Sequence, residues 1–246
     1  MNGLDIIDAD QRGSADHFTE AGQKLKQRIE DGRIVILKNC FAVDSLLALK
    51  KAVQHWGQRQ AVFPAGRSAS VANLNFHRID GADMPTRLPH TFHQYGFGNL
   101  DKLDPGLRSV LYQVAEPMLA LQNSVAGTNY QLSDPEVRVK FLHYPSGGGY
   151  LANHIHPLLP QRVGLITSLS DWEADYSEGG NIFSTDAGDI HTSPSHQIGD
   201  VLLFRYDIPH EIEPIDPHQV LDWNALAGKW SLVLELLSTN ALSDAI

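Results

Sequence analysis

The sequence predicts a single domain of mainly β structure, in which two antiparallel sheets form a jelly-roll barrel with flanking helices. About eight short apolar or alternating segments follow residue 135, and Gly- and Pro-rich turns separate them, as in antiparallel jelly rolls. Segments with the helical spacing of apolar residues precede these strands and can pack on one sheet. A chain of 246 residues can bury one full core, so we expect one domain over 1–246.

The composition excludes several classes of partner. A formal net charge of −10 argues against a nucleic-acid backbone or an anionic membrane surface. The single cysteine, Cys40, excludes a disulfide framework and suits a reducing compartment. The N-terminus lacks the pattern of a signal peptide, and no apolar stretch approaches the roughly 20 residues that span a bilayer. We expect a cytoplasmic protein that acts on small molecules, with no nucleic acid and no membrane as partner.

The N-terminal half is predicted to support the barrel. Helices are expected over 14–31, 43–56 and 104–125, with Ser14 and Asp104 as caps and a short strand over 33–37. Residues 58–103 show no clear period and are rich in Gly, Pro, Asn, His and aromatics. Such irregular stretches are usually lids or binding loops, although a loop packing its own aromatics is an equal alternative. Residues 1–135 thus form the helical support and lid region, and Phe92 and Tyr95 are candidate substrate contacts.

The jelly-roll core is predicted over 136–240, and its first strand alternates. Over residues 136–144, Val137, Val139, Phe141 and His143 share one face, and Arg138, Lys140, Leu142 and Tyr144 share the other. If the first set faces the core, the second faces the interior of the barrel. A solvated strand face is the alternative. Further strands are expected within 162–169, 172–184, 200–204, 209–215 and 230–237.

A pair of histidines marks the candidate metal site. His154 and His156 are two positions apart, a spacing that puts both imidazoles on one face of a strand. Two adjacent imidazoles are half of a transition-metal site, and His210, at the start of a later strand, is the best candidate for the third ligand. His191 and His196 lie in a turn-rich segment and are predicted to be surface residues.

Two further motifs accompany the histidines. Residues 178–180 form a Glu-Gly-Gly turn, and Lys229 and Ser231 lie two positions apart on one face of the last strand. With these motifs the chain resembles the Fe(II)/2-oxoglutarate-dependent oxygenases, whose pattern is His-x-Asp, a Gly-Gly turn, a distal His and a basic residue two before a Ser. The resemblance covers residues 136–238 and weakly the N-terminal half.

The resemblance implies a double-stranded β-helix with Fe(II) in the mouth of a cupin-like barrel and 2-oxoglutarate as cosubstrate. Lys229 and Ser231 would bind its 5-carboxylate, with Tyr144 as a further contact. The reaction would consume dioxygen, release succinate and CO2, and oxidise a C–H bond of a small, carboxylate-bearing molecule. Arg138, Arg162 and Arg205 are candidate contacts for that carboxylate, with a structural role as the alternative. The sequence leaves open the substrate, the kind of product and whether the chain forms a homodimer.

The chain departs from the family pattern at two positions. His156 replaces the family's carboxylate, so the site is more positive, and three neutral imidazoles also suit Zn(II), Cu(II) or Ni(II). Lys229 stands where most members have Arg. An arginine guanidinium can bind a carboxylate through two parallel hydrogen bonds, whereas the lysine ammonium acts as a point charge.

Two other functions compete with this interpretation. Cupin-type dioxygenases also use His-x-His and a distal His, without 2-oxoglutarate. Their motif usually adds a Glu five residues after the second His, where this chain has Gln161. A non-catalytic metal-binding relative is the third possibility, because an altered ligand set can accompany lost chemistry.

Overall fold

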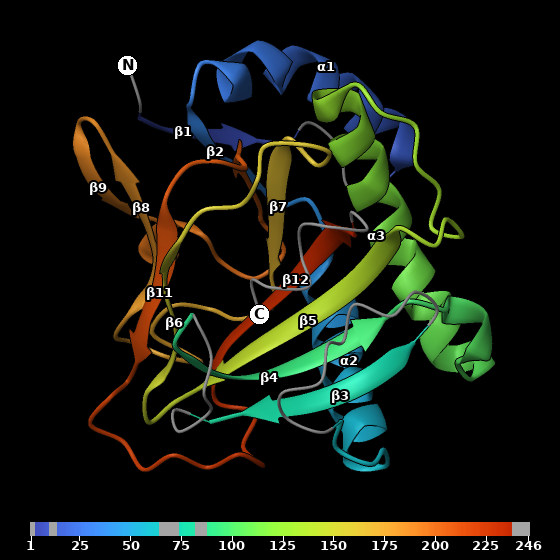
Figure 1. Cartoon of the computed structure of the whole chain (residues 1–246), viewed down its shortest axis with the longest axis vertical. Coiled ribbons are helices and arrows are strands. Elements are labelled where there is room, and N and C mark those ends of the chain that lie inside the picture. Colours follow the sequence, from blue (N-terminus) through green and yellow to red (C-terminus); the bar gives the residue numbers. More distant parts are fainter. Residues whose placement is uncertain (1–2, 10–13, 64–73, 82–87, 238–246) are drawn as a thin grey trace.

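The computed structural model describes residues 3–9, 14–63, 74–81 and 88–237. It contains a twelve-stranded sheet that curls into a barrel, with three α-helices beside it (Figure 1). Hydrogen-bonded neighbours follow the order β1-β2-β10-β7-β12-β5-β4-β6-β11-β8-β9, and β3 pairs with β4. The strands are β1 (Leu4–Asp8), β2 (Ile34–Lys38), β3 (Asn75–Asp80), β4 (His90–Phe97), β5 (Val137–Pro145), β6 (Gly149–His154), β7 (Val163–Ser168), β8 (Gly180–Thr185), β9 (Gly188–His191), β10 (Val201–Arg205), β11 (His210–Ile215) and β12 (Gly228–Leu236).

One strand belongs to both walls of the barrel. The second half of β4, His93–Phe97, pairs with β5 in the larger sheet, whereas His90 and Thr91 pair with β6 in the smaller one. The larger sheet therefore continues into the smaller sheet of β6, β11, β8 and β9, and the two enclose an interior. This is the jelly roll, or double-stranded β-helix, that the sequence predicts, with the expected eight strands after residue 135.

The stretch over 58–103 is the main error of the secondary-structure prediction. It was expected to be irregular, but β3 and β4 lie within it and pair over six residues, from Asn75↔Phe97 to Asp80↔Phe92. All eight residues of β4 are buried, polar and apolar alike, so no apolar/polar alternation reveals the strand. Residues 64–73 and 82–87 of the expected lid lie outside the described residues. The N-terminal strand β1 was also not predicted.

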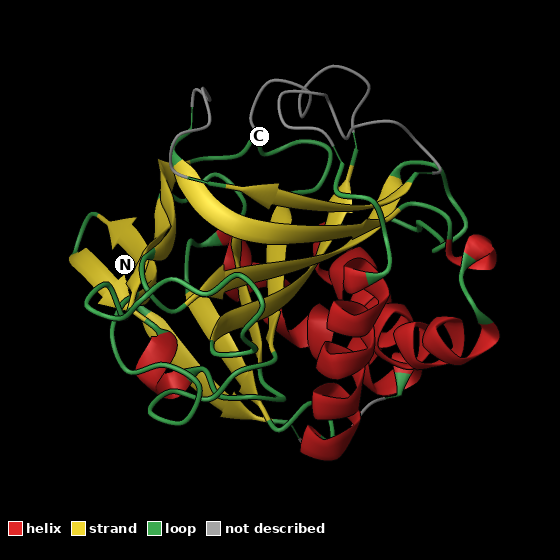
Figure 2. Cartoon of the chain, turned by 90° about the horizontal axis from the view of Figure 1, so that it is seen from below, coloured by secondary structure: helices red, strands yellow, loops and turns green. Residues whose placement is uncertain are grey.

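The helices lie against one side of the large sheet (Figure 2). They are α1 (Ala15–Glu30), α2 (Val43–Gln58) and α3 (Pro105–Ala126). The predicted caps are confirmed, because Ser14 Oγ accepts from His17 N at 3.2 Å and Asp104 Oδ1 accepts from Leu107 N at 3.0 Å. Within the described ranges, no helix is both long enough and apolar enough to cross a bilayer.

The alternation predicted for β5 is confirmed and also holds for its neighbour β12. Val139 and Phe141 of β5 pack in the main core beneath the helices, together with Leu232 and Leu234 of β12. The other set points into the barrel, because successive side chains of a strand face opposite sides. The interior therefore receives Arg138, Lys140, Leu142 and Tyr144 from β5 and Lys229, Ser231, Val233 and Glu235 from β12.

Asp216 ties three turns together at one end of the barrel. Its carboxylate accepts hydrogen bonds from Ser146 Oγ (2.7 Å), Ser177 N (3.0 Å) and Glu178 N (3.1 Å). We expect Asp216→Ala to lower the free energy of unfolding by about 3 kcal/mol, because four donors, Ser177 Oγ among them, lose their charged acceptor. Urea unfolding measures this change, and Asp186→Ala, which removes an exposed carboxylate, is the control. Equal stability of the two variants would contradict this role of Asp216.

Three buried histidines outside the metal-site candidate predict acid sensitivity. Burial, above all, lowers the pKa of His93, His143 and His196 to about 3, from an ordinary value of 6.5. Between pH 6.5 and 3 the unfolded chain therefore binds protons that the folded chain does not, and stability falls as the pH falls. Each histidine contributes a slope of up to about 1.4 kcal/mol per pH unit.

Unfolding in urea at several pH values between 7.5 and 4.5 tests this prediction. His143→Gln should reduce the slope of unfolding free energy against pH by the contribution of roughly one proton. His55→Gln, at an exposed position of α2, should leave this slope unchanged. A slope that His143→Gln does not alter would contradict the prediction.

Candidate metal centre

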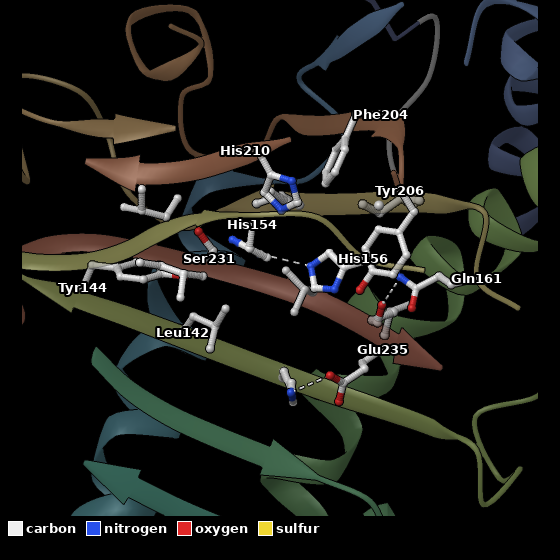
Figure 3. Close-up of a pocket in the computed structure, with 18 residues that line it drawn as sticks. Leu142, Tyr144, His154, His156, Gln161, Phe204, Tyr206, His210, Ser231 and Glu235 are labelled. Atoms are coloured by element: carbon white, nitrogen blue, oxygen red, sulfur yellow. Dashed lines mark hydrogen bonds and ion pairs between the residues drawn. The ribbon is translucent and has the colours of Figure 1, made fainter. Parts of the chain in front are cut away.

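Three histidines, two of them from neighbouring strands, converge inside the barrel (Figure 3). His154 is the last residue of β6 and His210 the first of β11, and the antiparallel register places the two directly opposite each other. His156 lies two residues beyond the end of β6, not within the strand as the spacing suggested. One ligand nitrogen from each ring lies within 4.8 Å of the others, so the grouping that the sequence predicts is present.

Hydrogen bonds to backbone carbonyls fix the orientation of two of the imidazole rings. His154 Nδ1–H donates to Ala152 O at 2.9 Å, and His210 Nδ1–H donates to Ile208 O at 2.8 Å. In the neutral rings the Nε2 lone pairs are then free to bind a metal. His154 Nε2 lies 3.2 Å from His156 Nε2, close to the roughly 3 Å that separates two nitrogens bound at right angles to one ion with bonds of about 2.1 Å.

Burial favours the neutral form of all three histidines. Burial, with smaller contributions from the neighbouring rings, lowers the pKa of His156 to about 2 and that of His210 to about 3. Burial also lowers the pKa of His154. A neutral imidazole offers a lone pair that a protonated one lacks, so burial prepares the cluster for a cation.

His156, which stands where the resemblance expects a carboxylate, is held differently from the other two. Its Nδ1 is buried and has no hydrogen-bond partner within the described part of the chain. Tyr206 stacks on the ring, with centroids 4.1 Å apart and planes at 7°. Stacking, and not a hydrogen bond from Nδ1, therefore orients this imidazole.

The histidines line a cavity of about 80 Å³ that is partly open to solvent. Tyr144 and Ser231, two of the three predicted cosubstrate contacts, line the same cavity. Its remaining walls are mostly apolar, with contributions from Leu142, Leu151, Leu165, Ile166, Phe204, Ile212, Val233 and Leu234. Such walls exclude water and strengthen polar interactions inside.

Lys229 does not line this cavity but lies just beyond it on the interior face. It is directly paired with Tyr144 and precedes Ser231 by two residues. Its side chain is fully buried, and Nζ contacts Tyr176, 3.4 Å from the hydroxyl and 5.5 Å from the ring centroid. Among the described residues, the hydrogen-bond partner of this ammonium is the Tyr176 hydroxyl, and no carboxylate pairs with it. An unpaired buried cation is costly, which favours a site for an anionic ligand.

Other buried polar groups near this end of the barrel also lack partners. Asn181 Oδ1 and Nδ2, Thr192 Oγ1 and His196 Nδ1 make no hydrogen bond to the part of the chain that is described. After burial, the charge of Lys229 is the next cause of the lowered pKa of His196. The prediction that His196 is a surface residue was wrong, because its side chain is fully buried. Only its loop-like sequence context suggested exposure.

The predicted substrate contacts separate into two groups. Phe92 and Arg138 belong to the barrel interior, where Phe92 packs edge-on to Tyr144 and Arg138 lies over Phe76. Tyr95 faces the helices and stacks on Trp230, since it is an odd number of residues from Phe92 on the same strand.

The other two predicted arginines lie away from the histidines. Arg162 and Arg205 line a separate surface cavity beside α1 and α3. Arg205 pairs there with Asp207 at 2.6 Å. Both arginines flank the ends of strands, where alternation no longer determines the side to which a side chain points.

Gln161 has a structural role. Its Nε2 donates to Leu234 O at 2.9 Å, and its Oε1 accepts from Leu236 N at 3.0 Å, so the amide joins the loop after His156 to β12. Cupin-type sites usually place a metal-binding Glu at this position. Since both ends of the Gln161 side chain are engaged with the backbone, the cavity offers no fourth protein ligand here.

Comparisons with known proteins detect likeness in structure only. No protein-family model and no curated protein match the sequence. A prolyl hydroxylase of Trichoplax adhaerens, solved with a hypoxia inducible factor peptide fragment, superimposes with a TM-score of 0.59 at 15% identity over 90% of this chain and 91% of that one. A full-length protein of Neurospora crassa, solved in complex with alpha-KG, gives a TM-score of 0.59 at 13% identity over 98% of this chain and 87% of that one.

A third structure, the 2-oxoglutarate binary complex of the auxin-oxidising dioxygenase AtDAO1 of Arabidopsis thaliana, gives a TM-score of 0.55 at 12% identity over 98% of this chain and 95% of that one. At these identities the comparisons establish a shared fold, and they do so over nearly the whole chain. The fold is therefore the double-stranded β-helix expected from the sequence, and the structural likeness also includes the part of the chain before β5.

Proposed function

We propose that the chain is a non-haem Fe(II)- and 2-oxoglutarate-dependent oxygenase that oxidises a C–H bond of a small molecule, releasing succinate and CO2. The observation that carries the proposal is the pairing of two features in one barrel. Three neutral histidines converge on one wall, and an ammonium without a carboxylate partner in the described chain is buried on the opposite wall. The first feature suits a divalent transition metal, and the second suits a dicarboxylate that bridges the two.

The chain's own residues have distinct roles in this proposal. His154, His156 and His210 hold Fe(II) through ring nitrogens, and the hydrogen bonds to Ala152 O and Ile208 O keep two of the rings in place. When bound, iron, 2-oxoglutarate and dioxygen together supply the oxidative decarboxylation and the oxidant. The redox chemistry belongs to these groups, and the protein binds, orients and keeps out water.

Lys229 neutralises the far carboxylate of 2-oxoglutarate, and Ser231 and Tyr144 contact the cosubstrate from the same face of the sheet. A lysine is a point charge, so it fixes the orientation of the carboxylate less than an arginine does. Asn181, Thr192 and His196 supply further hydrogen-bonding atoms at this end, which explains why their polar atoms lack partners in the described chain.

Anaerobic addition of Fe(II) and then 2-oxoglutarate tests the function. Chelation of iron by the keto acid gives a visible charge-transfer band, and we expect this band together with 2-oxoglutarate-dependent release of succinate when dioxygen is admitted. Binding of iron without the band would favour a three-histidine dioxygenase of the cupin type. Absence of iron binding would favour a non-catalytic relative.

A further inference from the structure

A buried ion pair lines the histidine cavity at a distance from Lys229. Lys140 extends from β5 and Glu235 from the end of β12, and Lys140 Nζ lies 2.7 Å from Glu235 Oε1. Both side chains are more than nine-tenths buried, and both form part of the cavity wall. Figure 3 shows Glu235 on the side of His156 that is remote from Tyr144. The cavity thus has a dipolar end in addition to the metal-site candidate.

Both members of the ion pair have hydrogen-bonding atoms without a partner in the described chain. Glu235 Oε2 is buried and has no hydrogen-bond partner in the described ranges. Lys140 Nζ has three donors, and its one hydrogen bond to a described residue is that to Glu235. Buried charged groups normally satisfy their remaining donors and acceptors, because leaving them bare costs free energy. A free carboxylate oxygen and free ammonium protons side by side therefore mark a place for a ligand with both a donor and an acceptor.

The charge pattern selects one class of ligand. A simple carboxylate could bind Lys140 but would bring its negative charge against Glu235. An amine could bind Glu235 but would face Lys140. A zwitterion meets both partners with opposite charges, so its binding adds no net charge to the buried ion pair. The adjacent wall contains Leu142, Leu151 and Val233, which suits an aliphatic side chain.

We propose that the primary substrate is an aliphatic α-amino acid, whose ammonium group binds Glu235 Oε2 and whose carboxylate binds Lys140 Nζ. This inference rests on the proposed function, because it assigns the substrate of the same site. 2-Oxoglutarate, a dianion, binds at the Lys229 end of the barrel, where no carboxylate of the described chain opposes it. The two ends thus separate the two small molecules by charge.

Calorimetric titration of the protein loaded anaerobically with Fe(II) and 2-oxoglutarate tests the proposal. The probes are L-leucine, 4-methylpentanoate, which lacks the amino group, and 3-methylbutylamine, which lacks the carboxylate. We expect L-leucine to bind at least about tenfold more tightly than either analogue, as one charged hydrogen-bonded contact is lost in each. Equal binding of the three probes, or no binding of leucine, overturns the proposal.

Paired variants assign each charge. Glu235→Gln should lower the affinity for L-leucine at least about tenfold without lowering the affinity for 4-methylpentanoate. Lys140→Met should lower the affinity for L-leucine without lowering the affinity for 3-methylbutylamine. Glu211→Gln on β11 and Lys51→Met on α2, outside the cavity, are the controls. If a single variant fails to fold, the double variant Lys140→Met/Glu235→Gln removes both charges together, and it should bind leucine and its analogues alike.

The charge-transfer band separates this proposal from the proposed function. A band in the wild type, with no preference for leucine over its analogues, would overturn the substrate class and leave the oxygenase assignment standing. Leucine selectivity that depends on Glu235 and Lys140, without any band, would support the amino-acid site and overturn the 2-oxoglutarate reaction. A loss of 2-oxoglutarate affinity in Lys140→Met equal to its loss of leucine affinity would assign Lys140 to the cosubstrate and overturn the proposal.

Discussion

Replacing His210 with alanine is expected to lower the affinity for Fe(II) at least about 100-fold and to abolish 2-oxoglutarate turnover. The loss of a residue that merely supports a metal ligand typically costs 10- to 100-fold, so the loss of a ligand should cost at least as much. His210 is the right position to test, because it comes from a different strand from His154 and carries its own hydrogen bond to Ile208 O. Anaerobic titration with Fe(II), or with Co(II) as a spectroscopic substitute, measures the change.

Position 156 provides the matched comparison for this experiment. His156→Ala should also lower the affinity for Fe(II). His156→Asp should keep or raise this affinity, because it restores the set of two histidines and one carboxylate that is usual for these oxygenases. His191→Ala, at an exposed histidine of β9, is the control. If both His156→Ala and His156→Asp left the affinity for iron unchanged, His156 would not be a ligand.

The second large effect is expected at Lys229, just beyond the cavity on the interior face of the barrel. Lys229→Ala should lower the affinity for 2-oxoglutarate about 100-fold and change the affinity for Fe(II) only a fewfold. Charged hydrogen-bonded contacts contribute roughly 1.5–3 kcal/mol, and 1.4 kcal/mol corresponds to a tenfold change in affinity. The fold should survive, because Lys229 has no carboxylate partner in the described chain to be left behind. Titration with 2-oxoglutarate, followed by the charge-transfer band, gives both affinities.

Two further variants sharpen the interpretation of Lys229. Lys229→Arg keeps the charge and offers two donors, so it should retain most of the affinity for 2-oxoglutarate if the buried site accepts the larger group. Lys24→Ala changes an exposed lysine of α1 and should have no effect. Equal losses of iron and 2-oxoglutarate in Lys229→Ala would indicate misfolding and would argue against a carboxylate-binding role.

Periodicity determines how much of this site is visible in the sequence. The two-residue period of β5 and β12 correctly separates Tyr144 and Ser231, which line the cavity, from Phe141 and Leu232, which face the helices. The histidine grouping also follows from strand geometry, because His154 ends one strand and His210 begins its hydrogen-bonded partner.

The features that escaped prediction depend on tertiary context. β4 is buried on both faces with polar residues on each, so its strand character has no apolar/polar period to show it. The pairing of Lys140 with Glu235 depends on the register that sets β12 against β5, and no local motif determines a register between strands separated by almost a hundred residues. Burial of His196 likewise comes from neighbours that are distant in the chain.

The strand that both walls share has a consequence for how this barrel can change. Because β4 hydrogen-bonds to β6 through its first half and to β5 through its second, deleting or inserting one residue between Thr91 and His93 would shift one pairing relative to the other. Such a shift would exchange the side chains that face the interior with those that face the helices. Substitutions can therefore alter this wall one position at a time, whereas changes of length should be tolerated only in the connecting loops.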